Sequence, residues 1–246
     1  MSSITLKNNK YDVLEYSNGD CYFKDKITNR YYFKNNYYAS KKYKFDYAKK
    51  NSFNIIDFIN IILVAISIYF WILLGVKYDD IYSLNLKKIE TSYYNIIAFF
   101  IISIIIHEIS HYLVLKSYGR EPGKIKIKRY KIFITIITDT TDSYLLPRYR
   151  RFFVYYAGVM SNIIELGIIY VFYSSYLYVL PIIFLGSIYN MMPLGGLNTD
   201  GYYILTNSIL KINNFKYKKN FITKIFTYLF FIIVIYYFVD YVCLFL

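Results

Sequence analysis

Cysteine, histidine and charged residues are scarce in this 246-residue chain, and each scarcity limits what the protein can be. The two cysteines, Cys21 and Cys243, lie near opposite ends of the sequence and form no CxxC pair, which argues against a disulfide framework and a cysteine metal site. Only 18% of the residues are charged, against 57% that are hydrophobic. The sequence also has no internal repeat and no low-complexity linker. What remains, dominated by apolar blocks, is typical of a membrane protein.

The apolar residues gather in blocks near the length of about 20 residues that a helix needs to cross a bilayer. Four blocks approach that length: Ile55–Val76, Tyr93–Leu115, Phe152–Ser174 and Phe221–Leu246. A fifth and shorter block, Tyr176–Pro193, ends in a glycine-rich break. The expected fold class is therefore mainly α, a polytopic membrane helix bundle of about five spans.

The loop charges predict how these spans are oriented, because cytoplasmic loops carry an excess of lysine and arginine. Residues 1–52 hold 11 basic and 5 acidic side chains, residues 76–92 hold 3 of each, and residues 116–151 hold 10 basic and 3 acidic. We expect a multi-pass cell-membrane protein with a cytoplasmic N-terminus, no removable signal peptide and an outside C-terminus. The net charge of +13 is spread over separate loops, which indicates contact with the lipid bilayer and not with nucleic acid.

Two stretches outside the spans read as β-structure. Residues 1–52 contain three alternating segments, Tyr11–Tyr16, Cys21–Lys26 and Arg30–Lys34, and an Asn18-Gly19 turn joins the first two. We interpret residues 1–52 as a small cytosolic β-hairpin element and residues 53–246 as the membrane domain. From Lys124 to Thr138, polar and apolar residues alternate again, which predicts a strand pair associated with the membrane surface.

Two histidines and a glutamate interrupt the aliphatic run from Ile101 to Leu115, where a charged side chain costs roughly 3 kcal/mol or more at the bilayer centre. In the sequence HEISH, His107 and His111 stand one helical turn apart, so both imidazoles project from one face and can hold one metal ion. Glu108 lies next to them without being needed as a ligand. This is the arrangement of a zinc peptidase, in which zinc lowers the pKa of bound water and the glutamate takes its proton. A histidine pair that only joins helices is the structural alternative.

A hydrolytic zinc site takes three protein ligands and leaves one position open for water. The chain has no third histidine, so the third ligand is expected to be a carboxylate. His107 lies eight residues from the cytoplasmic end of its predicted span, a depth of about 12 Å. Asp200 follows the short predicted span in glycine-rich backbone on the same side, whereas Asp240 lies near the outer end. Asp200 is therefore our choice, and Glu165, deep in the third span, is the alternative ligand.

Three further polar residues lie in or beside the predicted spans. Asp57 lies at the cytoplasmic start of the first span and is expected to snorkel toward water. Asn162 and Asn190 could line the site, where their amide groups would bind substrate backbone or an oxyanion. Hydrogen bonding between helices is an equal alternative for both asparagines.

Together these motifs resemble the site-2 protease family of intramembrane zinc metallopeptidases. The likeness rests on HEISH, on AGVMSN (Ala157–Asn162) and on NMMPLGGLNTDG (Asn190–Gly201), and it covers Asn95–Leu210. In that family the two histidines and the aspartate of a DG motif bind zinc, the glutamate is the catalytic base, and three core spans carry them in this order.

The resemblance thus implies that His107, His111 and Asp200 bind Zn²⁺ and that Glu108 is the catalytic base. The stretches TDTTDSYLLPRYRRFFVYYAG and TDGYYIL, with the N-terminal strands, look most like a bacterial branch associated with clusters that make and export modified peptides. One spacing differs, since the family's asparagine stands closer to the aspartate than the ten residues that separate Asn190 from Asp200.

The leading hypothesis is a zinc endopeptidase that hydrolyses a peptide bond in or near the bilayer, with a small peptide precursor or a membrane-anchored protein as substrate. A non-catalytic accessory or immunity protein that retains the fold is the first alternative. A component of a metal or peptide transporter is the second, although metal transport would need further acids or histidines along a path. No feature of the sequence points to a particular oligomeric state.

The charge pattern makes a testable statement about topology. A reporter fused after Leu246 is expected outside the cell, and one inserted within residues 116–151 is expected inside, because the second segment carries the basic excess. Reporter activity on each side of the membrane measures both. An even number of spans would place the reporter after Leu246 inside and would contradict the depth argument for Asp200.

Overall fold

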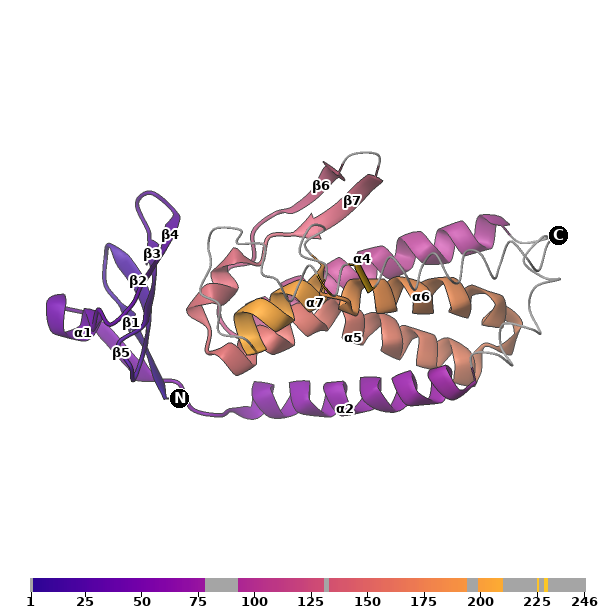
Figure 1. The fold of residues 1–246 in the computed structure, drawn as a ribbon, viewed down its shortest axis with the longest axis horizontal. Helices are drawn as coiled ribbons and strands as arrows, with labels where there is room; N and C mark the ends of the chain where they lie inside the picture. The colour runs from indigo at the N-terminus through magenta and orange to yellow at the C-terminus, as the bar shows by residue number, and fades with distance from the viewer. Residues whose placement is uncertain are drawn as a thin grey trace.

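The computed structural model describes residues 2–77, 93–130, 133–193 and 199–209, together with Ile225, Tyr228 and Leu229. These parts of the chain are mostly helical and include a small antiparallel sheet. Figure 1 shows the sheet at one end of the molecule and the long helices side by side next to it, with a two-stranded hairpin on one side of the bundle.

The N-terminal sheet has five antiparallel strands in the order β4-β3-β2-β1-β5. Their bounds are Ser3–Lys7 (β1), Tyr11–Tyr16 (β2), Cys21–Asp25 (β3), Arg30–Lys34 (β4) and Tyr47–Lys50 (β5), and the short helix α1 spans Ala39–Lys42. The three predicted strands are β2, β3 and β4, and β3 ends one residue earlier than expected. The turn at Asn18-Gly19 is also present, with Gly19 at a φ of 81° that favours glycine. Sequence reasoning missed β1 and β5, so the element is a sheet and not a hairpin.

Alternation along the strands gives this sheet two buried faces. One face carries a cluster of Leu6, Val13, Cys21 and Phe23, closed by Ala39 of α1. The opposite face carries a second cluster of buried residues, Leu14, Tyr16, Tyr22 and Leu145. Leu145 belongs to the short 3₁₀ helix η1 (Thr141–Leu145), which directly precedes the central helix of the bundle. The sheet is therefore packed onto the helical part of the protein.

Charged contacts reinforce this packing at Asp142 of η1. The Asp142 carboxylate accepts hydrogen bonds from the Lys24 ammonium at 2.8 Å and the Tyr31 hydroxyl at 2.7 Å. Burial alone would raise the pKa of Asp142, but these bonds and the charges of Lys24 and Arg120 hold it below its ordinary value. The guanidinium of Arg151 also lies over the Tyr22 ring at 4.1 Å.

Three described helices are long and apolar enough to cross a membrane: α2 (Ile55–Val76), α4 (Tyr93–Ser117) and α5 (Arg148–Phe172). They correspond to three of the predicted spans, with ends shifted by four residues at most. Within its most apolar window α5 is 72% buried, against 17% for α2 and for α4. The helix α5 is therefore the centre of the bundle, and α2 and α4 present most of their apolar surface outward.

The remaining predicted spans have different outcomes. Residues 174–191 form the 3₁₀ helix η2 (Ser174–Val179) and the helix α6 (Leu180–Met191), whose 12 residues are too few to cross a bilayer alone. The predicted span Phe221–Leu246 lies outside the described residues apart from the three residues named above. A bundle of about five spans stays a prediction, and the described part of the chain supplies three candidates.

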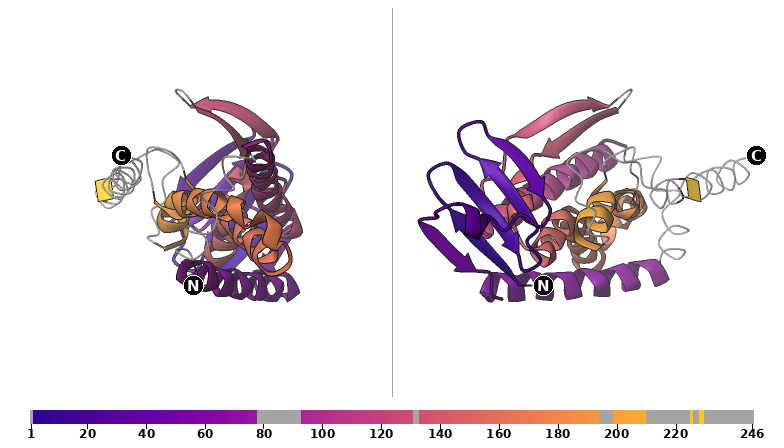
Figure 2. Two further views of the ribbon diagram at one scale, coloured as in Figure 1. Left: turned by 90° about the vertical axis from the view of Figure 1, so that its right-hand side faces the viewer. Right: turned by 60° about the vertical axis from the view of Figure 1, so that its left-hand side comes forward.

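The predicted strand pair is present as an antiparallel hairpin of β6 (Ile125–Tyr130) and β7 (Phe133–Thr138). Figures 1 and 2 show it on the α4 side of the bundle, directed away from α2. After α6, the chain continues through the short helix α7 (Asp200–Tyr203) into a π-helical turn, η3 (Ile204–Ile209), both packed against α5.

The expectation that Asp57 snorkels to water is wrong. Its side chain is fully buried and forms a two-pronged ion pair with Arg150 of α5, with distances of 2.8 Å and 2.7 Å. The same carboxylate accepts the backbone N–H of Asn54, whose side chain in turn caps the start of α2. Because Arg150 lies in the first turn of α5, beside the start of α2, its charge neutralises the carboxylate inside the protein, and Asp57 has no need of water.

This pair predicts a stability effect. The Asp57→Asn variant should lose about 3–5 kcal/mol of unfolding free energy, because it leaves the Arg150 charge buried without its partner. The matched control is Lys26→Gln, which breaks the more exposed Lys26–Asp12 pair at 3.4 Å and should cost less than about 1 kcal/mol. Thermal unfolding of both purified variants in the same detergent measures the difference. Equal melting temperatures of the two variants would mean that the buried Asp57–Arg150 pair stabilises the protein no more than the exposed pair does.

Candidate metal centre

The two histidines of HEISH lie on one face of α4, as their spacing predicts. Their rings are 4.9 Å apart between centroids and nearly perpendicular, at 76°. His107 is 6% exposed and His111 is 5% exposed, so both imidazoles lie inside the bundle. A pair of buried polar rings needs polar partners, because an unpaired polar group in an apolar interior is costly.

Asp200 brings a carboxylate to both rings. It begins α7, and its Oδ2 lies 2.9 Å from Nε2 of His107 while its Oδ1 lies 3.3 Å from Nε2 of His111. The neighbouring Gly201 explains how α7 reaches this place. A Cβ atom added at Gly201 would lie 1.8 Å from the backbone oxygen of Met191, so only glycine lets α7 start directly against the end of α6.

The geometry of these three side chains fits a metal ion. One ligand atom from each of His107, His111 and Asp200 lies within 4.8 Å of the others. Around a tetrahedral zinc with bonds of about 2.0–2.1 Å, ligand atoms stand about 3.3 Å apart, close to the distances from Asp200 to the two imidazoles. Oδ2 of Asp200 is buried and has no hydrogen-bond partner among the described residues. Two imidazole nitrogens and a carboxylate that converge in this way suit a divalent cation.

The central helix α5 orients the two imidazoles through contacts to their Nδ1 atoms, which face away from Asp200. Nδ1 of His111 donates a hydrogen bond to the backbone oxygen of Val154 at 2.6 Å, which leaves Nε2 free to bind metal. Nδ1 of His107 lies 3.3 Å from the side-chain amide of Asn162, whose Oδ1 is buried and has no hydrogen-bond partner among the described residues. Exchanging the amide nitrogen and oxygen of Asn162 makes Oδ1 the acceptor from Nδ1–H and frees Nε2 of His107 as well.

Between these two contacts, Gly158 allows α5 to approach the metal ligands. A Cβ atom at Gly158 would lie 2.3 Å from Nε2 of His107 and 2.5 Å from two carbons of the same ring. Val154, Gly158 and Asn162 are spaced four residues apart, so they form one stripe along α5 facing the two histidines. Along this stripe, Val154 offers a backbone oxygen, Gly158 leaves room for the His107 ring, and Asn162 offers a side-chain amide.

Glu108 is oriented differently from its neighbour His107. Its Oε2 accepts a hydrogen bond from the backbone N–H of Thr138 at 2.6 Å, and the Thr138 hydroxyl donates to the backbone oxygen of Glu108 at 2.9 Å. Thr138 is the last residue of β7, so both bonds fasten the hairpin to α4 beside the histidines. Glu108 is not one of the three residues that could share a metal ion.

The remaining predicted residues are placed as follows. Glu165, the alternative third ligand, lies on α5 with its Oε2 buried and unpartnered among the described residues, but it is not part of the metal-binding group. Asn190 lies near the end of α6, half-buried, and has no side-chain hydrogen bond within the described part of the chain. The glycine-rich residues 194–198 between it and Asp200 lie outside the described residues. The proposed substrate contacts of Asn162 and Asn190 stay predictions.

Sequence reasoning missed three contributors to this site: Val154, Gly158 and Thr138. Val154 acts through its backbone oxygen and Thr138 largely through its backbone N–H, so neither role leaves a signal in the side-chain pattern. Gly158 did carry a signal, since a glycine inside a predicted helix costs about 1 kcal/mol relative to alanine and needs a packing reason.

Comparisons with known proteins add one relative. A Bacillus subtilis (strain 168) protein named "Putative peptide zinc metalloprotease protein YydH" is 29% identical over 117 residues. The match covers 45% of this chain and 46% of that protein, so it spans about half the length of either. No family model matches the chain. No solved structure matches it either. The likeness suggests a zinc protease in general terms.

The contact at Gly158 yields a prediction about metal binding. The Gly158→Ala variant should bind zinc at least about tenfold more weakly, because displacing a ligand or its outer partner typically costs 10–100-fold. The control is Gly186→Ala on α6, where an added Cβ meets nothing within 4 Å. Zinc per protein after dialysis against graded chelator measures both variants. Unchanged zinc retention in Gly158→Ala would show that α5 does not position His107.

Proposed function

We propose that this protein is a zinc-dependent endopeptidase of the site-2 protease type, which hydrolyses a peptide bond within or beside the membrane. The observation that carries the proposal is the convergence of His107, His111 and Asp200 inside a bundle of membrane-length helices, with Glu108 beside them. The name of the Bacillus subtilis relative supports the same reaction class and a peptide as substrate.

His107, His111 and Asp200 would hold Zn²⁺ and leave a fourth position open. When bound, the ion would lower the pKa of a water molecule and polarise the scissile carbonyl. Glu108 takes the proton of the attacking water and passes it to the leaving amine nitrogen. Its Oε2 is held by the Thr138 N–H, so the carboxylate has a defined direction before substrate arrives.

The substrate must reach the site as extended chain, because the carbonyls of a membrane helix are already hydrogen-bonded. The hairpin of β6 and β7 supports such a conformation, since it offers strand edges to a third strand. Its last residue, Thr138, touches Glu108, so a segment paired along β7 would run toward the proposed base. Contact of this hairpin with lipid is the competing account of its alternating sequence.

The proposal is tested by separating metal binding from catalysis. Glu108→Gln keeps size and hydrogen bonding but removes the base, so it should retain zinc and lose about 10²–10⁴-fold in cleavage rate. His107→Ala and Asp200→Ala should lose both zinc and cleavage. Cys21→Ser, at a buried thiol in the N-terminal sheet, is the control that should match wild type in both.

The measurements are metal content per protein and the peptides that accumulate in cells carrying wild type or Glu108→Gln. Preserved cleavage in Glu108→Gln would remove the role of this residue as base. Zinc retention without any difference in cellular peptides would favour the non-catalytic accessory protein. Full zinc content in Asp200→Ala would transfer the third-ligand role to Glu165, and iron in place of zinc in wild type would contradict the proposed cofactor.

A further inference from the structure

A basic cavity lies where the N-terminal sheet meets the helix bundle, away from the metal centre. Its volume is about 370 Å³, within the range of small-molecule sites. Strands β1 and β5 form one wall, and the start of α2, the end of α4 and the start of α5 form the other. Five of its lining residues are basic and none is acidic; the basic residues are Lys7, Lys49, Lys50, Arg120 and Arg150.

The pairing of β1 with β5 explains why lysines gather on this wall. Thr5 stands opposite Lys49 and Lys7 stands opposite Tyr47 in the antiparallel register. Residues two apart on a strand share a face, so Lys7 and Lys49 lie on the same side of the sheet as Thr5. No acid among the described residues lines this cavity, so negative charge that balances the lysines must come from elsewhere.

The described part of the protein supplies little of that charge. Arg150 is paired with Asp57, and Arg120 lies 3.8 Å from Asp12 and also near Asp142, whose pKa its charge lowers. No acid among the described residues pairs with the three lysines of the cavity. A second cavity of about 380 Å³ shares Lys7, Gly119 and Arg120 with the first. That second cavity is lined by four basic and three acidic residues, so its charge is nearly balanced, whereas five basic residues and no acid line the first.

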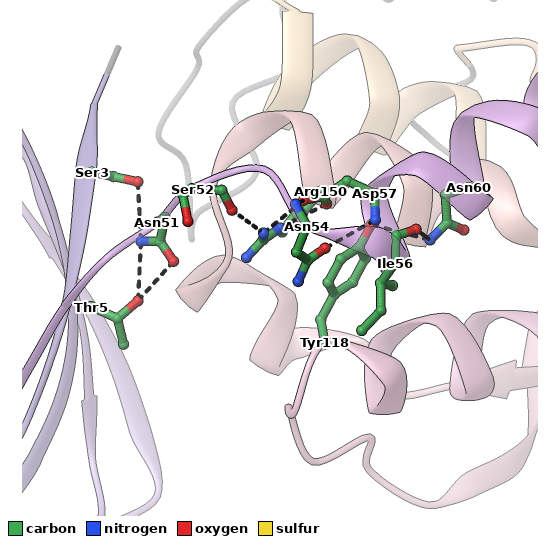
Figure 3. A network of polar contacts seen from close by, with 10 residues as sticks. All are labelled: Ser3, Thr5, Asn51, Ser52, Asn54, Ile56, Asp57, Asn60, Tyr118 and Arg150. Atoms are coloured by element: carbon green, nitrogen blue, oxygen red, sulfur yellow. Dashed lines mark hydrogen bonds and ion pairs between the residues drawn. The ribbon is translucent and has the colours of Figure 1, made fainter.

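The floor of the basic cavity is built from side chains that hold one another in place (Figure 3). The Asn51 amide bonds the hydroxyls of Ser3 and Thr5 at the edge of the sheet. The Arg150 guanidinium donates to the backbone oxygen of Ser52 and to Asp57. Arg120 and Arg150 are 7% and 8% exposed, so both cations are nine-tenths buried. The arginine side of the cavity is therefore prearranged, while Lys49 and Lys50 on β5 are exposed to solvent.

Its height relative to the membrane indicates the source of that anion. The lining includes Asn54, which caps the start of α2, and Ser117, the last residue of α4. Both candidate spans thus leave their apolar sections at the level of the cavity. Lipid headgroups lie at this level, and their phosphates attract clustered lysine and arginine.

We propose that this cavity binds the phosphate of an anionic membrane lipid, with the headgroup lodged between the N-terminal sheet and the ends of α2 and α4. Lys7, Lys49 and Lys50 supply the charge for the phosphate, and the Ser117, Tyr118 and Asn51 side chains lie close enough to the cavity to bond headgroup oxygens. The ligand bridges the two parts of the protein, because its contacts come from both.

The experiment uses the full-length protein in uncharged detergent. Binding of short-chain phosphatidylglycerol, short-chain phosphatidylcholine and inorganic phosphate is measured by the rise in melting temperature over a concentration series. Phosphatidylglycerol should bind saturably to wild type, phosphatidylcholine should not, and inorganic phosphate should bind more weakly than the lipid. In the variant Lys7→Gln/Lys49→Gln/Lys50→Gln, affinity for phosphatidylglycerol should fall about tenfold or more.

The matched control removes three charges from the helix and loops of the same N-terminal region outside the cavity, as Lys10→Gln/Lys41→Gln/Lys44→Gln, and should bind like wild type. Replacing Lys7, Lys49 and Lys50 with arginine should preserve binding, which shows that a loss in the glutamine variant reflects charge and not misfolding. Equal losses in the two glutamine variants would overturn the site. Equal binding of the two lipids would overturn its charge selectivity, and inorganic phosphate binding as tightly as phosphatidylglycerol would overturn the lipid source.

Discussion

The close approach of α5 to two buried histidines is the contact on which the candidate metal centre depends. Gly158 leaves room for the imidazole of His107, and the residues one turn before and after it, Val154 and Asn162, supply polar partners to the histidine rings. A larger residue at Gly158 would separate α4 from α5, and both partners would then be lost together. Two imidazoles and a carboxylate left in an apolar bundle would carry a large desolvation cost, which a bound divalent cation offsets.

One helix, α4, carries both the proposed ligands and the proposed base, yet they are held by different parts of the protein. His107 and His111 face α5, whereas Glu108, one residue further along, is directed to the end of β7. Consecutive residues on a helix point about 100° apart, so a single turn can serve both directions. The consequence is that a shift of the hairpin would move the proposed base while the proposed metal ligands stay in place.

The sequence was sufficient for the parts of the protein that depend on local periodicity. Membrane-length helices follow from apolar blocks, the strands β2 to β4 follow from alternation, and the histidine spacing follows from the helical repeat. Contacts between distant segments left no such signal. Asp57 was expected to reach water because its partner, Arg150, is 93 residues away along the chain. All four residues of the short edge strand β5 are exposed, and two of them are lysines, so its sequence shows no alternation of buried and exposed positions from which a strand could be recognised.

The N-terminal sheet and the candidate metal centre both contact α5, so the position of one affects the other through this helix. The first turn of α5 carries Arg150, which is paired with α2, and Arg151, which lies over Tyr22 of the sheet. Val154 follows one turn later and Gly158 one turn after that, so the contacts to the histidines begin only about 6 Å along the axis from Arg150. A buried helix that is close-packed along its length transmits a displacement of its first turn to the next ones. The N-terminal sheet and the buried Asp57–Arg150 ion pair thus fix the position from which α5 presents Gly158 to His107.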